Sequence, residues 1–96
     1  MTNVISIQSS VTVMSKFFNP AIPIKVKEGE NKVPIGFVHN RKQVKVRRID
    51  RQWHLREGWW RDEVVREYFQ LETSRFVCMI YRDMLSGGWY LQRIYD

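Results

Sequence analysis

The chain has 96 residues, of which 44% are hydrophobic and 14% aromatic, which suits one globular domain with one core and leaves no room for a second. The formal net charge is +6, and the single cysteine, Cys78, excludes an internal disulfide. No apolar stretch approaches the ~20 residues of a membrane-spanning helix, and the first residues do not form a signal peptide, so we expect a cytoplasmic protein with no membrane partner.

The positive charge is concentrated in the first part of the chain. Residues 1–58 carry eleven Lys and Arg against four acidic residues, whereas residues 59–96 carry five against six. Such an asymmetry indicates a polyanionic partner and is not an argument about the fold.

Residues 1–16 are predicted to form a flexible N-terminal arm. They are rich in Ser, Thr, Val and Ile, alternate only weakly, and carry no charge before Lys16. Met14 is an alternative start, because the patterned sequence begins just after it. Residues 17–96 are predicted to form a small all-β domain.

The first predicted strand, Ile22–Lys27, alternates between apolar residues that face the core and lysines, Lys25 and Lys27, that face solvent. Pro23 cannot donate a hydrogen bond to a neighbouring strand and therefore predicts an edge strand. A polar turn at residues 28–32 precedes a second, interrupted strand at residues 33–38. Gly36 in this strand permits another backbone segment or an aromatic ring to pack closely against it. Residues 39–42 are predicted to form a hairpin loop.

The third predicted strand starts at residue 43 and carries both apolar and basic side chains. Val44 and Val46 share one face, which we expect to be buried. Period-2 alternation then places Lys45 and Arg47 in solvent, because a slip of one residue would bury both cations.

A change of phase follows at residues 47–48. Ile49, Trp53 and Leu55 have the opposite parity to the two valines. The change predicts a β-bulge, a common device where a sheet curls into a barrel. Beyond the bulge, Ile49 and Trp53 are expected to turn inward.

The segment from Arg61 to Glu72 fits two patterns. As a helix it would place Val64, Val65 and Tyr68 on one face, whereas its content of Val, Tyr and Phe favours a strand. We expect a strand from about residue 66, and a single helical turn at residues 62–65 remains open.

The last third of the chain is predicted to form three antiparallel strands, Tyr68–Thr73, Phe76–Arg82 and Trp89–Tyr95. The run at residues 76–81 is apolar at every position, which predicts a strand with both faces covered, and Cys78 within it is expected to be buried. Together these strands predict an all-β domain, a single small antiparallel sheet of five or six strands, strongly bent or closed as an SH3-like barrel.

Several chemistries lack the residues that they need. His39, His54 and one cysteine match no zinc-ligand spacing, and the adjacent carboxylates Asp62 and Glu63 would point to opposite faces of an extended segment. The five glycines fit no phosphate-binding loop. We therefore predict no catalytic residue, no metal site and no cofactor, and expect the protein not to be an enzyme.

The run from Arg41 to Arg51 is the strongest functional signal, with six cations and one anion in eleven residues. A cationic sheet face with exposed aromatic residues suits a nucleic-acid backbone and its bases. Alternatively, these residues form an ordinary solvent-exposed strand, in which lysines at the sheet edge prevent aggregation. The candidate nucleic-acid-binding residues are Lys25, Lys27, Arg41, Lys42, Lys45, Arg47, Arg48 and Arg51.

Trp59 and Trp60 give the alternative function. Two adjacent Trp in an extended segment cannot both point inward, so one of them can complete the core while the other meets a partner. The alternative is a protein–protein interaction module with an exposed tryptophan as its anchor, although a curling chain could also bury both rings.

Several sequence blocks, taken in order, resemble a known family. They are Phe18…Ile24-Lys25-Val26, Pro34-Ile35-Gly36-Phe37, Arg41…Val44-Lys45-Val46 running to Trp53, Trp59-Trp60, Tyr68-Phe69-Gln70-Leu71, and Tyr81-Arg82-Asp83…Gly87-Gly88-Trp89-Tyr90-Leu91…Tyr95-Asp96. Together they are similar to a small bacterial domain of unknown function that occurs alone. Similar sequence appears at the C-terminal end of ImuB-type proteins, the inactive relatives of Y-family translesion polymerases. The resemblance covers about Phe17 to Asp96, implies a DNA-repair context, and brings no catalytic residue with it.

Overall fold

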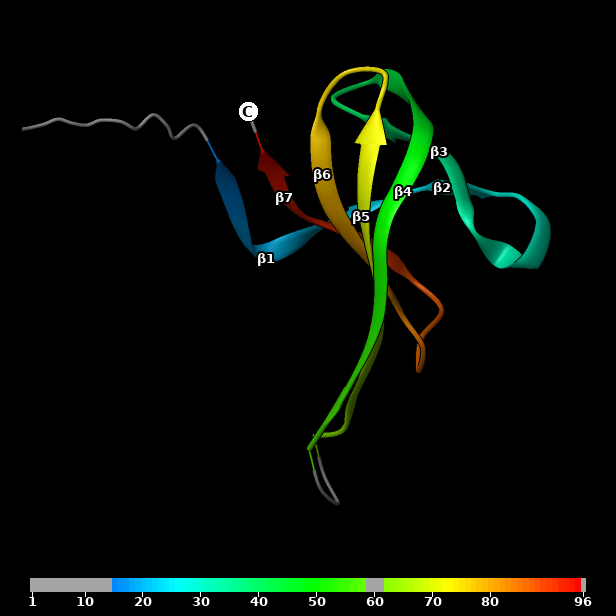
Figure 1. The fold of residues 1–96 in the computed structure, drawn as a ribbon. Coiled ribbons are helices and arrows are strands. Elements are labelled where there is room, and N and C mark those ends of the chain that lie inside the picture. Colours follow the sequence, from blue (N-terminus) through cyan, green and yellow to red (C-terminus); the bar gives the residue numbers. More distant parts are fainter. Residues whose placement is uncertain (1–14, 59–61, 96) are drawn as a thin grey trace, which may run out of the picture.

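The computed structural model describes residues 15–58 and 62–95, which form one antiparallel sheet of seven strands curled into a half-barrel (Figure 1). The strands are β1 (Lys16–Ile24), β2 (Val26–Glu28), β3 (Pro34–His39), β4 (Lys42–Glu57), β5 (Val64–Thr73), β6 (Val77–Asp83) and β7 (Trp89–Tyr95), with a short 3-10 turn, η1 (Glu30–Lys32), between β2 and β3. Their order across the sheet is β1-β7-β6-β5-β4-β3-β2. The prediction of an all-β domain with one antiparallel sheet is confirmed.

The sheet has seven strands where five or six were expected. Its half-barrel shape agrees with the strongly bent alternative and not with a closed SH3-like barrel. The predicted strand at residues 22–27 is two strands, because the pairing partner changes at Lys25. Ile24 pairs with Trp89 on β7, whereas Val26 pairs with Phe37 on β3. One continuous segment of chain thus borders both ends of the sheet.

The edge position predicted from Pro23 is confirmed, because β1 is an outermost strand of the sheet. The last three predicted strands agree with β5, β6 and β7 to within a few residues. β5 begins earlier than expected, at Val64, which pairs with Glu57 on β4. A helical turn at residues 62–65 is therefore wrong, since Val64 and Val65 already belong to the strand.

The core lies on the inner face of the half-barrel. Phe69, Leu71, Cys78, Ile80 and Leu91 are fully buried there, and Phe37 and Val44 join them from the other side of the curve. Burial raises the pKa of the Cys78 thiol to about 12. The predicted buried cysteine is therefore confirmed, and its thiol is un-ionised at neutral pH.

The bulge predicted in β4 is present, because the register against β5 shifts between Val46 and Arg48. Ile49 turns inward opposite Leu71, as expected. A second shift between Ile49 and Arg51 reverses the parity again. The inward orientation expected for Trp53 is therefore wrong, because Trp53 pairs with Tyr68 on the outer face.

A row of aromatic residues covers the outer face of the central strands. Trp53, Tyr68, Tyr81 and Tyr90 are register partners on β4, β5, β6 and β7. Their ring centroids are separated in turn by 5.3, 5.2 and 5.2 Å. This row covers the outer face at Tyr81, the last residue of the apolar run at residues 76–81. Farther along β6, the outward Met79 pairs with Gln70 and Arg93.

Candidate nucleic-acid interface

The basic residues of β2, β3 and β4 come together through strand register. Lys27 on β2 pairs with Gly36 on β3, and Gly36 pairs with Lys45 on β4. Register partners point to the same face, and the neighbouring row Val26–Phe37–Val44 faces the core. Lys27 and Lys45 therefore lie on the outer face on either side of a residue that has no side chain.

Gly36 leaves a hollow between the two lysines. The hollow has a volume of about 350 Å³ and is lined by Lys27, Ile35, Gly36, Gln43, Val44, Lys45 and Val46. A smaller one, of about 120 Å³, adjoins it and is lined by Lys25, Lys27, Gly36, Phe37, Val38 and Gln43. Within the described residues, both hollows have basic, amide and apolar side chains and no carboxylate.

Two exposed apolar side chains flank this surface. Ile35 is 40% exposed and Val38 is 44% exposed. We call the surface formed by Lys25, Lys27, Ile35, Gly36, Val38, Gln43 and Lys45 the basic groove. It combines positive charge, which suits a nucleic-acid backbone, with exposed aliphatic side chains. The aromatic residues expected for stacking on bases are not part of the groove.

The other predicted cations are also exposed, but they divide into three settings. Arg47 occupies the first bulge of β4, next to the basic groove. Arg41 and Lys42 belong to the β3–β4 turn, where Asn40 and Arg41 both have positive φ, 52° and 64°. Positive φ at both central residues is the geometry of a two-residue type I′ hairpin.

Arg48 and Arg51 are engaged elsewhere. Arg48 lies 2.6 Å from Asp50 and 3.0 Å from Glu72, and these partners raise the pKa of its guanidinium. The guanidinium of Arg51 lies 5.1 Å from the centre of the Trp53 ring. The structure thus separates these two arginines from the basic groove, although the sequence run includes them.

Sequence patterning missed the outer aromatic row. Within it, Arg66 lies 4.3 Å above the ring of Tyr81 and donates a 2.9 Å hydrogen bond to the hydroxyl of Tyr68. Tyr68 and Tyr81 are buried, whereas Trp53 is half-buried. A stack of this kind, capped by guanidinium groups, places aromatic faces on the same outer side of the sheet as Lys45 of β4.

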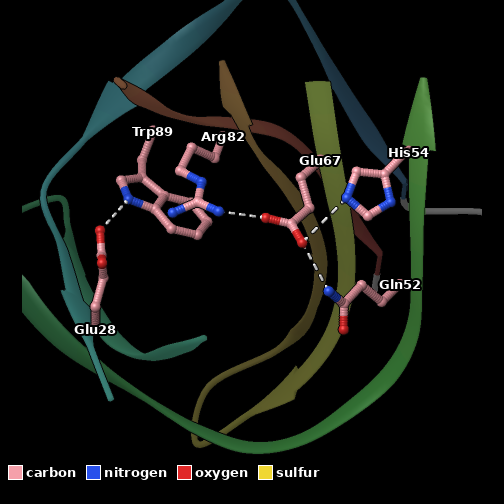
Figure 2. Close-up of polar contacts among 6 residues, drawn as sticks. All are labelled: Glu28, Gln52, His54, Glu67, Arg82 and Trp89. Atoms are coloured by element: carbon pink, nitrogen blue, oxygen red, sulfur yellow. Dashed lines mark hydrogen bonds and ion pairs between the residues drawn. The ribbon is translucent and has the colours of Figure 1, made fainter. Parts of the chain in front are cut away.

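The inner face carries a polar network centred on a buried carboxylate, Glu67 (Figure 2). Arg82 donates a 2.6 Å hydrogen bond to one oxygen of Glu67, and Gln52 donates a 2.8 Å bond to the other. Nε2 of His54 lies 3.4 Å from that second oxygen. Both carboxylate oxygens are occupied, so this cluster ties β4, β5 and β6 together.

A second polar contact crosses the inner face. The indole N–H of Trp89 on β7 donates a 3.0 Å hydrogen bond to a carboxylate oxygen of Glu28 on β2, and Arg82 lies over the Trp89 ring (Figure 2). This bond satisfies a buried indole and joins β2, at one edge of the sheet, to β7, the strand next to the opposite edge.

The remaining predicted features divide between described and undescribed residues. Trp59 and Trp60 lie outside the described residues, as do residues 1–14 of the predicted arm. Across residues 15–58 and 62–95, no group of His, Cys, Asp and Glu is arranged to hold a metal ion. The same part of the chain contains no helix of the length and apolarity that a membrane crossing requires.

No protein-family model, no curated protein and no solved structure matches this chain.

Proposed function

We propose that this domain is a non-enzymatic accessory module that binds nucleic acid through the basic groove. The observation that carries the proposal is the row Lys27–Gly36–Lys45, in which two lysines on the strands either side of β3 flank a hollow lined by no described carboxylate. Phosphates would contact the ammonium groups, and a base or sugar would lie against Ile35 and Val38. Arg47 and Arg41 extend the positive surface along β4 and its turn. Lys42 pairs with His39 and has the parity of Val44, so it lies on the opposite face and lines a separate hollow with Arg75.

The cellular setting of this proposal rests on the sequence resemblance. Similarity to the C-terminal segment of ImuB-type proteins suggests a DNA-repair role, and the expected location, which does not come from the resemblance, is the cytoplasm. The alternative, a protein-interaction module anchored by Trp59 or Trp60, concerns residues outside the described ones. The two functions differ in salt dependence, because phosphate contacts release counterions and a tryptophan anchor does not.

The test is a binding titration with fluorescently labelled single- and double-stranded oligonucleotides that carry 5′-hydroxyl ends. Four contacts from Lys25, Lys27, Lys45 and Arg47 to a single strand predict a slope of log K against log salt of about −3. Binding measured at about 50 mM and about 200 mM salt gives that slope. Absence of binding at the lower salt concentration would contradict the proposal.

The double variant Lys45→Glu/Arg47→Glu tests the groove itself. Both side chains are exposed, so we expect binding to be abolished and the melting temperature to stay nearly unchanged. The matched control is Lys32→Glu/Arg56→Glu, which alters net charge equally at exposed positions outside the groove. Equal losses in the two double variants would show that net charge alone drives binding.

A further inference from the structure

The β3–β4 and β5–β6 turns lie at the same end of the half-barrel (Figure 1). A second basic hollow is lined by residues of these two turns and of the strands beside them. Its volume is about 550 Å³, the largest of the hollows described in this structure. Its lining is Lys16, His39, Asn40, Lys42, Ser74, Arg75, Phe76 and Ile94. These residues come from β1, β3, the β3–β4 turn, β4, the β5–β6 turn and β7, so strand order, and not sequence proximity, assembles them. We call it the end pocket.

The charges of the end pocket are all of one sign. Lys16, Lys42 and Arg75 line it, and its described lining includes no carboxylate. None of the three cations forms an ion pair with any residue in 15–58 or 62–95. Three cations that converge on one hollow repel one another, and an anion bound there would relieve the repulsion.

The positive charge of the end pocket affects the pKa of His39. Its burial and the charges of Arg75 and Lys16 lower the pKa of its imidazole below the ordinary value of 6.5. His39 is therefore neutral near pH 7, and one of its ring nitrogens can donate a hydrogen bond to an anion. Its ring packs edge-on against Phe76, with 5.9 Å between the ring centres, which limits how the imidazole can turn.

The β5–β6 turn holds its part of the pocket in a fixed conformation. The hydroxyl oxygen of Thr73 accepts bonds from the backbone N–H groups of Arg75 and Phe76, at 3.2 and 3.0 Å. Ser74 is joined to Lys45 by two bonds: its backbone N–H donates to the Lys45 carbonyl at 2.8 Å, and its hydroxyl accepts from the Lys45 N–H at 3.1 Å. Because Ser74 Oγ accepts in that bond, its own proton is available to a ligand.

We propose that the end pocket binds a phosphomonoester dianion, such as the 5′-phosphate of a nucleotide, either free or at the end of a strand. A monoester carries a charge of about −1.5 to −2 near neutral pH, which matches three convergent cations better than the single charge of a diester. The hydroxyl of Ser74 and the neutral imidazole of His39 supply donors that a phosphate oxygen accepts. Phe76 and Ile94 give the attached sugar or base an apolar wall.

The first experiment measures the binding of AMP, adenosine, 3′,5′-cyclic AMP and inorganic phosphate to the full chain by NMR titration. At about pH 7.5, above the second phosphate pKa of about 6, AMP is a dianion. We expect AMP to bind roughly tenfold more tightly than cyclic AMP, which is a singly charged diester, and adenosine not to bind. Bound AMP should also raise the pKa of His39. Equal binding of AMP and adenosine, or no binding of AMP, would overturn the proposal.

Two double variants test whether AMP binds in the end pocket. Lys42→Gln/Arg75→Gln should weaken AMP binding roughly tenfold or more, whereas Lys27→Gln/Lys45→Gln removes the same charge from the basic groove and should change it less than about twofold. Similar losses in both pairs would refute a site in the end pocket. A melting curve of each variant confirms that the fold is intact.

A last comparison separates the two sources of the phosphate. An oligonucleotide with a 5′-phosphate should bind more tightly than its 5′-hydroxyl counterpart if the pocket takes a strand end, and Arg75→Gln should remove that difference. Equal binding of the two oligonucleotides, together with tight binding of AMP, assigns the pocket to a free nucleotide. Only the strand-end result rests on the proposed nucleic-acid binding, because AMP binding is independent of the basic groove.

Discussion

At the scale of single residues, Arg41 combines an unfavourable backbone conformation with a candidate binding charge. Its φ of 64° lies in the left-handed region, where a side chain with a Cβ is strained. Asn40, its neighbour in the turn, is the residue type that tolerates this region best after glycine. The turn would therefore be more stable with glycine at position 41.

We expect Arg41→Gly to raise the free energy of unfolding by about 0.5–1 kcal/mol, because the strain relieved exceeds the added entropy of the unfolded chain. The same variant should weaken oligonucleotide binding, since a cation is lost. Asn40→Gly is the control: it alters the same turn and leaves the charge in place. Chemical denaturation and the binding titration measure the two effects, and a loss of stability in Arg41→Gly would contradict the assignment of strain.

The alternation of apolar and basic residues in the sequence correctly predicted that the cations of the basic groove and the neighbouring Arg47 are exposed. Lys25, Lys27, Lys45 and Arg47 are exposed as predicted, because each follows a position that must be buried. The engagement of Arg48 with Glu72 could not be read from the sequence, since the two residues meet only through the register between β4 and β5. The end pocket could not be predicted from the sequence either, because its residues span positions 16 to 94 and meet only through the strand pairing.

At the scale of elements, the buried carboxylate of Glu67 fixes three strands to one another. Glu67→Ala should lower the free energy of unfolding by about 3 kcal/mol or more, because it leaves the guanidinium of Arg82, whose side chain is only 15% exposed, without its charged partner. The control is Glu72→Ala on the same strand, whose ion pair with Arg48 is exposed and is expected to contribute about 0.5 kcal/mol or less. Urea denaturation of both variants measures the difference, and equal losses would contradict a structural role for the network.

The two bulges of β4 show where strand prediction succeeded and failed. The first was predictable, because Val46 and Ile49 are both apolar and lie at positions of opposite parity. The second, between Ile49 and Arg51, was not, because Trp53 looks like a core residue in the sequence. Aromatic residues can also cover an outer face by stacking on each other, and only the register with Tyr68 reveals that Trp53 does so.

At the scale of the whole molecule, the end pocket makes stability depend on pH. The pKa of His39 is lowered in the fold, so the unfolded chain takes up a proton near pH 6.5 that the folded protein resists. The contribution of His39 to the free energy of unfolding is therefore fully present above about pH 6.5. It is lost as the pH falls from there towards the lower pKa that His39 has in the folded protein.

This dependence predicts a falling melting temperature between about pH 7 and pH 5.5, which His39→Gln should largely remove. Arg75→Gln should weaken it, because one of the charges that oppose protonation is lost. Thermal melts across this range measure both effects. A wild-type melting temperature that stays constant through this window would contradict the role of His39.

The number of strands and the curvature of the sheet were predicted less well than its class. The sequence predicts six strands, and the seventh arises because the pairing partner changes at Lys25. That change has no signature in composition or periodicity, since Ile24 and Val26 continue the same alternation. The change of partner is set by the folded sheet, in which β7 lies beside the first half of the segment and β3 beside the second half.

The change of partner at Lys25 also sets an order of events in folding. Every other ladder of the described sheet joins strands that follow each other in the chain, whereas β1 pairs with β7, so that Lys16 meets Ile94. A contact between residues so distant in the chain closes the longest loop and carries the largest entropic cost, so it is expected to form last. The β2–β7 meander can then assemble by local steps, with β1 joining it at the end. The amide protons of β1 that bond to β7 should accordingly exchange with deuterated water before those of the β5–β6 ladder.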